Sequence, residues 1–505
     1  MNKLILCAVL ALTPALAATC DDLAKSQLPN TTIAAAAVVA QGAFVQPAPA
    51  GAKGKGKGAN PYATTPEFCR VELTLAPTND SDIKVEVWLP TRGWNGKYQA
   101  VGNGGWAGTI TYNAMAQAVE RGYAASSTDT GHVGGRGIFA LGHPEKLIDY
   151  SYRSVHEMTL KAKTLIQQFY GSPARLSYWV GCSTGGRQGL TEAQRYPDDF
   201  DGIVAGAPAN YFVHLHAWSL WTYQAVNKTP ESFLANEHLQ VLKNAALAAC
   251  DAQDGLKDGL IDNPKGCKFD PATVQCASGA ATGCLTPAQV AAAKQLYAPA
   301  ANPRTGEEIF PAFSPGSEMA WGTLAGRRPA DVAADTFRYV VFQNPEWDAM
   351  TLNFDSDVRK ADDIAQGYGL NSIDPDLSKY FAHNGKMIMY HGWNDQLIAP
   401  GNSINYYSSV AQKLGGVSKI DESMRLFMAP GMNHCNGGDG PSAFDAVTLL
   451  EQWVEQGQAP AKMVASHATA GQVDRTRPLC PYPQVAKYGG SGSSDDASNF
   501  ACMAP

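Results

Sequence analysis

Short apolar runs that end in glycine-rich or acidic turns recur along the chain. Residues 83–89 alternate apolar and polar side chains, as a half-buried strand does. Residues 154–170 carry a helical pattern and lie between two of the other runs. Strands that alternate with helices predict a mostly parallel α/β sheet. The other apolar runs are residues 98–101, 123–127, 176–180, 203–205, 387–390 and 426–428.

The alternation stops between residues 210 and 380. That region holds four cysteines, an acidic loop, alanine-rich helical stretches and many aromatic side chains. We interpret residues 210–380 as a lid domain inserted into the α/β core, whose two parts are residues 18–209 and 381–505. Residues 51–60, GAKGKGKGAN, are expected to form an exposed loop, because they lack the strand-to-helix setting and the Gly-Lys-Ser/Thr ending of a phosphate-binding loop.

The N-terminus has the three parts of a secretion signal. Asn2 and Lys3 give a short positive segment, residues 4–12 are apolar, and Ala15-Leu16-Ala17 is an Ala-x-Ala cleavage site. We expect residues 1–17 to be a signal peptide and the mature protein to be secreted or periplasmic. No later segment has about 18 uninterrupted apolar residues, so no membrane span is expected.

Composition and charge narrow the classes of function. Hydrophobic residues make up 45% of the 505 residues and charged residues 17%, which supplies a large core and excludes a globally disordered chain. The formal net charge is −7 and no basic stripe is present, so a nucleic-acid-binding protein is not expected.

The cysteine count fits an exported protein. Cys7 lies inside the signal, and the other ten of the 11 cysteines are an even number, as a disulfide framework requires. Proximity in sequence proposes three pairs and leaves four cysteines for two more, although spacing alone does not prove connectivity. The proposed pairs are Cys250–Cys267, Cys276–Cys284 and Cys480–Cys502, which leaves Cys20–Cys69 and Cys182–Cys435.

Residues 181–185, Gly-Cys-Ser-Thr-Gly, match the G-x-S-x-G pattern and make Ser183 a candidate nucleophile. The strand expected at residues 176–180 precedes the motif, and residues 187–195 after it have helical character. This strand–turn–helix setting presents a serine at the edge of an α/β-hydrolase sheet. The alternative is a glycine-rich turn with an idle serine, so Ser183 needs a base and an acid as partners.

The order along an α/β-hydrolase chain is serine, acid, histidine. Two histidines follow the last expected strand, and we favour His434, which comes directly after that strand, over His467 in a separate C-terminal segment. Asp395 follows the preceding strand and is the candidate acid, with a turn-capping aspartate as the alternative. His391 comes before this acid, and we interpret it as structural.

An acyl-transfer site also needs N–H donors for the oxyanion. The backbone N–H after the nucleophile, that of Thr184, is one candidate. A second donor is expected from the early turn Gly102–Trp106, which follows residues 98–101. We assign Gly105, with Gly104 as the alternative, because a residue without a side chain lets its N–H face the substrate oxygen.

Residues 250–260, CDAQDGLKDGL, indicate a different kind of site. Carboxylate and backbone carbonyl oxygens are the ligands that Ca²⁺ prefers, and the glycines permit sharp turns between them. The spacing is not that of an EF-hand. Because three acids this close repel one another without a cation, we favour structural Ca²⁺ over a solvated acidic turn. The expected ligands are the side chains of Asp251, Asp254 and Asp258 and the carbonyls of Leu256 and Leu260.

These motifs resemble those of the tannase/feruloyl esterase family over nearly the whole chain, from about Cys20 to Cys502. Members of that family are secreted serine esterases with an α/β-hydrolase core and a calcium-bearing lid. The resemblance therefore implies a triad of Ser183, Asp395 and His434, with a Cys182–Cys435 disulfide beside it. The motifs that carry it are Gly102–Trp106, residues 128–132, Gly181–Arg187, residues 251–260, His391–Pro400, Gly431–Cys435 and residues 477–483.

The resemblance implies aromatic esters as substrates, either small esters or ester-decorated plant polymers. We expect feruloyl esters first, with galloyl esters or mono(2-hydroxyethyl) terephthalate as alternatives. A secreted protein that binds aromatic ligands on a hydrolase scaffold is the rival from a non-enzyme class, and a serine peptidase is a further rival. Hydrolysis of p-nitrophenyl acetate that is absent in Ser183→Ala would separate an esterase from a binding protein.

Overall fold

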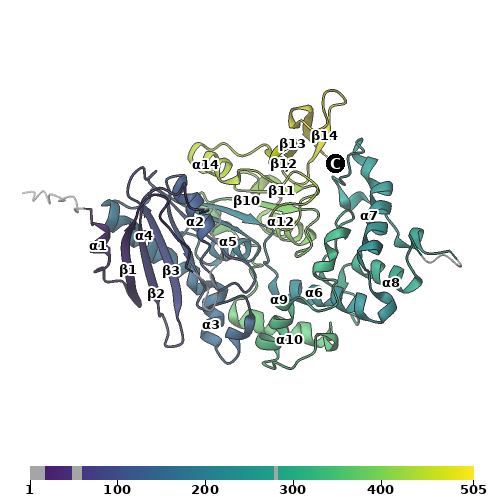
Figure 1. Ribbon diagram of the computed structural model, residues 1–505, viewed down its shortest axis with the longest axis horizontal. Helices are drawn as coiled ribbons and strands as arrows, with labels where there is room; N and C mark the ends of the chain where they lie inside the picture. Colours follow the sequence, from purple (N-terminus) through teal and green to yellow (C-terminus); the bar gives the residue numbers. More distant parts are fainter. Residues whose placement is uncertain (1–16, 48–59, 278–281, 505) are drawn as a thin grey trace, which may run out of the picture.

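The computed structural model describes residues 17–47, 60–277 and 282–504 (Figure 1). The expected signal peptide at residues 1–17 lies outside the described residues except for Ala17. Of the loop expected at residues 51–60, only Asn60 is described.

A nine-stranded sheet forms the centre of the molecule, in the order β1-β2-β3-β5-β4-β6-β7-β10-β11. β1, β2, β3 and β5 pair antiparallel, and the strands from β5 to β11 pair parallel. This is the α/β-hydrolase fold, and all seven expected strands are present. The strands are β1 (Thr31–Val39), β2 (Phe68–Leu75), β3 (Ile83–Pro90), β4 (Lys97–Val101), β5 (Ala124–Thr128), β6 (Leu176–Cys182), β7 (Gly202–Gly206), β10 (Lys386–Gly392) and β11 (Met424–Ala429).

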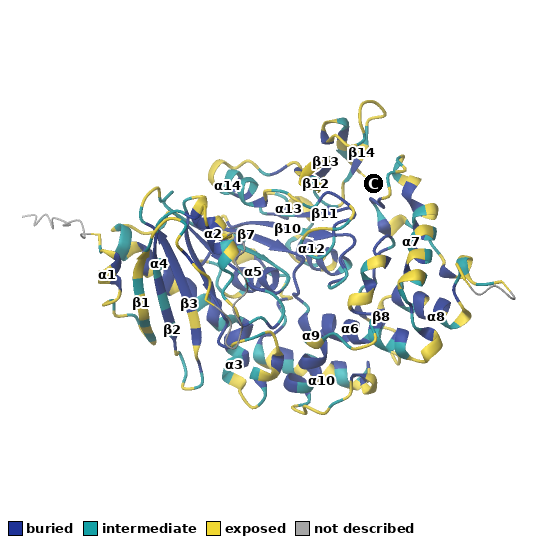
Figure 2. Ribbon diagram, viewed as in Figure 1, coloured by how far each residue is buried: buried dark blue, intermediate teal, exposed yellow. Residues whose placement is uncertain are grey.

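Helices cover both faces of the sheet, so central strands such as β5 and β7 are buried along their whole length. In β10, Met387 and Met389 pack into one core and Ile388 into the other. Figure 2 shows the buried centre that results. One face is covered by α4 (Ser154–Tyr170), α5 (Thr184–Arg195) and α12 (Gly401–Leu414), and the other by α2 (Tyr112–Glu120) and α14 (Ala446–Gln456). The shorter helices include α1 (Cys20–Leu23), α3 (Pro144–Ile148) and α13 (Val417–Ile420).

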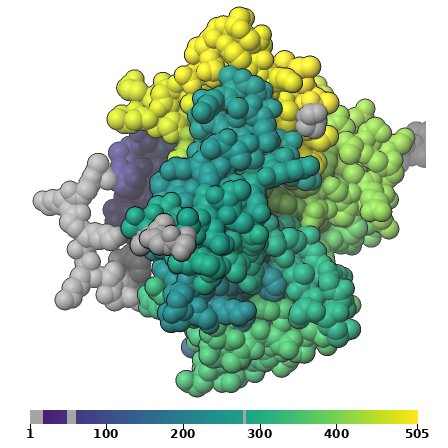
Figure 3. Space-filling model, turned by 90° about the vertical axis from the view of Figure 1, so that its right-hand side faces the viewer, coloured from purple at the N-terminus to yellow at the C-terminus, as the bar shows by residue number. Residues whose placement is uncertain are grey.

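Residues 207–385, here called the insertion, lie between the neighbouring strands β7 and β10. The insertion stands beside the carboxyl ends of the parallel strands, on the right in Figure 1, and faces the viewer in Figure 3. Its core includes Trp218 and Phe337 and is continuous with Trp106 and Tyr150 of the sheet domain. Its elements include α6 (Phe212–Asn227), α7 (Asn236–Cys250), α8 (Pro287–Leu296), β8 (Ala300–Ala301), β9 (Glu308–Phe310), α9 (Asp331–Asp335), α10 (Ser356–Tyr368) and α11 (Ser378–Ala382).

The C-terminal residues form two hairpins above the insertion, coloured yellow in Figure 3. The first joins β12 (Met463–Thr469) to β13 (Gln472–Leu479), and the second joins β14 (Val485–Tyr488) to β15 (Phe500–Met503). A disulfide between Cys480 and Cys502 ties them together. The other disulfides are Cys20–Cys69, Cys182–Cys435, Cys250–Cys267 and Cys276–Cys284, so all five expected pairings are present. Within the described ranges, no helix combines the length and the apolar character needed to cross a bilayer.

Candidate active site

Ser183 occupies a sharp turn between β6 and α5. Its φ of 63° and ψ of −123° are unusual for a residue with a side chain, and such strain persists only where the surroundings hold it. The turn needs glycine at Gly181, where a Cβ atom would lie 2.5 Å from the backbone of Gly185. The Ser183 N–H donates to the Gly206 carbonyl, and the Ser183 carbonyl accepts from Ala209 N–H, both at 3.0 Å. The serine is therefore fixed at the end of the sheet, where it lines a cavity.

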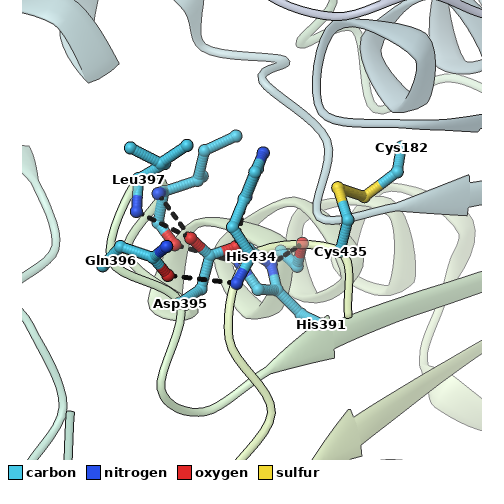
Figure 4. The surroundings of a disulfide bond; sticks show 9 residues. Cys182, His391, Asp395, Gln396, Leu397, His434 and Cys435 are labelled. Atoms are coloured by element: carbon cyan, nitrogen blue, oxygen red, sulfur yellow. Dashed lines mark hydrogen bonds and ion pairs between the residues drawn. A yellow bond between two sulfur atoms is a disulfide. The ribbon is translucent and has the colours of Figure 1, made fainter. Parts of the chain in front are cut away.

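His434 and Asp395 follow the neighbouring parallel strands β11 and β10, so they lie at the same end of the sheet as Ser183. The Nδ1 atom of His434 is 2.8 Å from Oδ2 of Asp395 (Figure 4). The His434 N–H also donates to the Gln396 side chain at 3.1 Å. Because Nδ1 is used by the carboxylate, Nε2 is the nitrogen left for the cavity, which His434 also lines. His467, by contrast, pairs with Asp474 across the β12–β13 hairpin at 2.6 Å.

The carboxylate of Asp395 is fully buried and accepts four hydrogen bonds. Oδ1 accepts from the backbone N–H groups of Leu397 at 2.8 Å and Ile398 at 2.9 Å, and Oδ2 accepts from His434 and His391. Burial alone would raise the pKa of Asp395, but the two histidines outweigh it and hold the pKa well below its usual range. Asp395 is therefore an ionised group that can orient an imidazole.

His391, which we expected to be structural, contacts the candidate acid directly. Its Nε2 lies 3.1 Å from Oδ2 of Asp395 and 3.0 Å from the carbonyl oxygen of Ile398, and its Nδ1 lies 2.7 Å from Oγ of Ser403. A carbonyl only accepts, so Nε2 carries the proton and the Ser403 hydroxyl donates to Nδ1. The sequence signal for this role is a histidine at a strand end, four residues before the acid.

A disulfide joins the residue before Ser183 to the residue after His434. The Cα atoms of Cys182 and Cys435 are 6.0 Å apart, although 253 residues separate them in sequence. Figure 4 shows this bridge beside His434 and Asp395. Among the described residues, no hydrogen bond joins Ser183 to His434. Both line the same cavity, and the disulfide fixes the two loops that carry them.

The turn after β4 contributes three glycines to the cavity lining, Gly102, Gly104 and Gly105. The Gly104 carbonyl accepts from Ala107 N–H at 2.9 Å, which fixes the peptide plane that carries the Gly105 N–H. The Gly105 carbonyl accepts from the Tyr150 hydroxyl at 2.7 Å and from the Thr184 hydroxyl at 3.1 Å. This network links the two expected oxyanion donors, and Tyr150 is a member that sequence reasoning missed.

The cavity has a volume of about 620 Å³, which suits a small organic ligand. Ser183, His434 and the glycine turn lie on its wall, and helix α6 and other parts of the insertion contribute most of the apolar lining. The apolar side chains of the lining are Ala209, Phe212, Leu215, Leu324, Val332, Leu397 and Ile398. Within the described residues, the lining includes no lysine, arginine, aspartate or glutamate.

The acidic loop after α7 is compact and tied to the C-terminal hairpins. Asp251 accepts from Asp258 N–H at 3.1 Å, and Asp254 accepts from Leu256 N–H at 2.8 Å. Asp258 accepts from Leu260 N–H at 3.2 Å and forms an ion pair with Arg477. The five expected calcium ligands are thus gathered in one loop, with Arg475 and Arg477 beside them.

A fourth aspartate, Asp262, belongs to the same group and was missed by sequence reasoning. It is buried, and its Oδ1 has no hydrogen-bond partner among the described residues. Burial raises the pKa of Asp262 to about 7, and the charges of Asp254, Asp258 and Asp251 add to this rise while Arg477 opposes it. An orphaned carboxyl oxygen beside three further acids is an environment that fits a hard cation.

Another acidic group, which sequence reasoning did not find, is formed by α4, α5 and the segment between α5 and β7. Ligand atoms of His156, Glu192 and Asp199 lie within 4.8 Å of one another. His156 Nδ1 is 2.6 Å from Asp199, and burial together with Asp199 raises the pKa of Glu192 well above its usual range. Neither carboxyl oxygen of Glu192 has a hydrogen-bond partner among the described residues, and the raised pKa favours the protonated, uncharged form of this side chain.

Comparison with known proteins agrees with this architecture. A family model described as tannase and feruloyl esterase matches residues 69–503. A probable feruloyl esterase B-2 of Aspergillus fumigatus is 35% identical over 471 residues, which cover 88% of each chain. An uncharacterized esterase of Xanthomonas campestris is 37% identical over 540 residues, covering 97% of this chain and 92% of the relative.

Solved structures agree as well. The crystal structure of feruloyl esterase B from Aspergillus oryzae superposes with a TM-score of 0.89 at 32% identity, covering 96% of this chain and 99% of that one. Tannin acyl hydrolase from Aspergillus niger shares the fold with a TM-score of 0.79 at 22% identity, covering 95% and 92% of the two chains. The chain therefore belongs to the tannase and feruloyl esterase family, a family of carboxylic ester hydrolases.

Proposed function

We propose that this protein is an exported serine esterase that hydrolyses aromatic carboxylic esters through an acyl-enzyme, with feruloyl esters preferred. The observation that carries the proposal is the 2.8 Å contact between His434 and Asp395 at the wall of a cavity that Ser183 also lines. The five disulfides support export, because disulfides persist mainly in oxidising compartments.

The proposed reaction follows from the chemistry of these groups. Nε2 of His434 takes the Ser183 proton while the serine oxygen attacks the ester carbonyl, and the N–H groups of Thr184 and Gly105 stabilise the oxyanion. His434 then protonates the leaving alcohol, and a water molecule activated by the same imidazole releases the aromatic acid. Asp395 holds the imidazole in the tautomer that this cycle needs.

The lining of the cavity supports a neutral aromatic acyl group. Apolar side chains can pack against a planar ring. The described lining contains no cation that could pair with the carboxylate of a terephthalate. We therefore rank mono(2-hydroxyethyl) terephthalate below feruloyl and galloyl esters as a substrate. The relatives that are more than 30% identical include feruloyl esterases, which supports feruloyl esters as the first choice.

We also propose that Asp251, Asp254 and Asp258, with the carbonyls of Leu256 and Leu260, hold a structural Ca²⁺. The clustering of the carboxylates and the orphaned oxygen of Asp262 support this proposal. Bound Ca²⁺ would supply positive charge to the loop and link it to the fold. It has no step in the reaction.

The proposed function is tested by kcat/KM for methyl ferulate, methyl gallate, chlorogenate, mono(2-hydroxyethyl) terephthalate and a long-chain aliphatic ester. We expect methyl ferulate to be hydrolysed fastest and the aliphatic ester slowly. Faster turnover of the aliphatic ester than of every aromatic ester would exclude the proposed substrate class. Absence of hydrolysis of every ester would favour a binding protein.

A further inference from the structure

We propose that His216 and Ser219 form a subsite that binds a neutral hydroxyl group on the aromatic ring of the acyl substrate, and thereby selects phenolic esters. The inference rests on the proposed esterase function and specifies which aromatic esters the cavity favours. Neither residue carries a role in the reaction itself.

Both residues lie on the face of α6 that lines the cavity. The segment before α6 is tied to the nucleophile, because Ala209 N–H donates to the Ser183 carbonyl at 3.0 Å. Phe212, His216 and Ser219 then recur at intervals of four and three, so they share one face of the helix, and all three line the cavity. Ser219 lies about 10 Å along the axis from Phe212 at about 1.5 Å per residue. An acyl group that lies along α6 therefore meets an apolar surface first and a polar pair beyond it.

Ser219 lines the cavity and carries a buried hydroxyl group without a protein partner. The residue is only 2% exposed, and its Oγ makes no hydrogen bond within the described part of the chain. Buried hydroxyl groups almost always have a partner, so one that is free at the wall of an apolar cavity indicates a ligand group. The neighbouring hydroxyl of Thr222 differs, because it donates to the Ser219 carbonyl at 2.8 Å and is satisfied within the helix.

His216 presents an acceptor to the same cavity. Its Nδ1 lies 2.8 Å from Oγ1 of Thr336, which is also 3.0 Å from the carbonyl of Val332. The carbonyl only accepts, so Thr336 donates to it and accepts from Nδ1–H of His216, which leaves Nε2 unprotonated. Burial, aided by the charge of Arg187, lowers the pKa of His216 to about 3. The imidazole is therefore neutral near physiological pH.

This pair matches the chemistry of a phenol. A phenolic hydroxyl can donate to Nε2 of His216 and accept from the Ser219 hydroxyl. A carboxylate has no proton to donate to Nε2 of His216, and its charge would have no cation partner in the described lining. An unsubstituted ring would leave both protein groups without a partner, and sites built to bind a hydroxyl reject analogues that lack it.

The subsite is tested by two esters that differ only in that hydroxyl, methyl 4-hydroxycinnamate and methyl cinnamate. The measured quantity is the ratio of their kcat/KM values, first in the wild-type enzyme and then in variants. We expect the wild-type ratio to exceed 1, and Ser219→Ala to lower it by about 3- to 10-fold, the range for one neutral hydrogen bond. His216→Phe removes the acceptor and should lower it as well.

Thr222→Val is the matched control, because it removes a buried hydroxyl one turn away on the same helix but outside the cavity lining. We expect this variant to keep the wild-type ratio. A wild-type ratio near 1, or an unchanged ratio in Ser219→Ala, would overturn the subsite. The wild-type ratio is measured on the unaltered protein, so this part of the test remains valid even if a variant fails to fold. Failure of the proposed function would be distinct, because neither cinnamate ester would then be hydrolysed.

Discussion

The Nε2 atom of His391 lies 3.1 Å from Oδ2 of Asp395 and donates to the carboxylate oxygen that also accepts from His434. The Asp395 carboxylate thus lies between two imidazoles. The imidazole of His391 is fixed in turn by the hydroxyl of Ser403. His391 is not among the residues that line the cavity, so it acts on the reaction through its contacts with Asp395 and Ile398.

Removal of the His391 side chain, which donates to Asp395, should change the pH dependence of the reaction. In His391→Leu, the Asp395–His434 pair loses a hydrogen bond that favours the ionised carboxylate, so the pair holds its proton more tightly. We expect the acid limb of kcat/KM to move to higher pH by less than about one unit, because one hydrogen bond contributes about 1 kcal/mol. His391→Gln keeps an N–H donor and should restore the wild-type limb. A purely structural role would lower kcat in His391→Leu without moving the limb.

The disulfide beside the site should matter for rate as well as for stability. The double variant Cys182→Ala/Cys435→Ala frees the loops that carry Ser183 and His434, and a misplacement of about 1 Å can cost roughly 100-fold in rate. We expect kcat to fall about 10- to 100-fold and the free energy of unfolding to fall by about 2–4 kcal/mol.

The control for this prediction is Cys276→Ala/Cys284→Ala, which removes a bridge in the insertion between residues only eight apart in sequence. It should leave kcat close to wild type. Peptide mapping without reduction should recover residues 182 and 435 in one linked fragment, and alkylation of either cysteine in the unreduced, denatured protein would reject the bridge.

Removal of calcium should lower thermal stability. A ligand that binds only the folded state stabilises it by mass action, so EDTA should lower the Tm by roughly 5 °C, and added Ca²⁺ should restore it. Asp254→Ala should abolish this response, whereas Asp363→Ala, an exposed aspartate on α10, should retain it. If prolonged EDTA treatment leaves the Tm unchanged and elemental analysis detects no calcium, the loop is only an acidic turn.

The preference for a phenolic ring should not depend on pH in the neutral range. Burial lowers the pKa of His216 to about 3, so its imidazole stays neutral as the pH rises from roughly 5 to 8. The ratio of kcat/KM for methyl 4-hydroxycinnamate over methyl cinnamate should therefore be constant across that range. A ratio that changes near pH 6.5 would show that a histidine with an ordinary pKa governs it.

The strands that were predicted have a strong local signal, but β2 was not predicted although apolar and polar residues alternate along it. β10 is an apolar run that ends in a turn, and Asp395 lies in that turn. β1 (Thr31–Val39) was missed because its four successive alanines give no alternation and much of it is exposed at the sheet edge. It is ordered by pairing with β2, more than thirty residues later, and such a partner leaves no mark on the local sequence. The hairpins formed by β12 to β15 were missed in the same way.

The residues of the site differ in the same way, because only some of them carry a local sequence signal. Ser183 and His434 each follow an expected strand within a recognisable motif, so their roles could be inferred before their geometry. Tyr150, Ser403 and Asp262 act through contacts with residues distant in sequence or through burial, and neither is visible in a local pattern. Functional partners of this kind emerge only when the fold brings them together.

The most direct test of the account is covalent trapping of the nucleophile. An activated aryl phosphate ester that phosphorylates reactive serines should inactivate the enzyme in a one-to-one ratio, and tandem mass spectrometry should place the label on Ser183. Ser183→Ala should resist labelling, keep the wild-type fold and lose about 10³-fold or more of kcat on methyl ferulate. A label on another residue, or an enzyme that keeps its activity with Ser183 labelled or replaced, would contradict the central claim that Ser183 forms the acyl-enzyme.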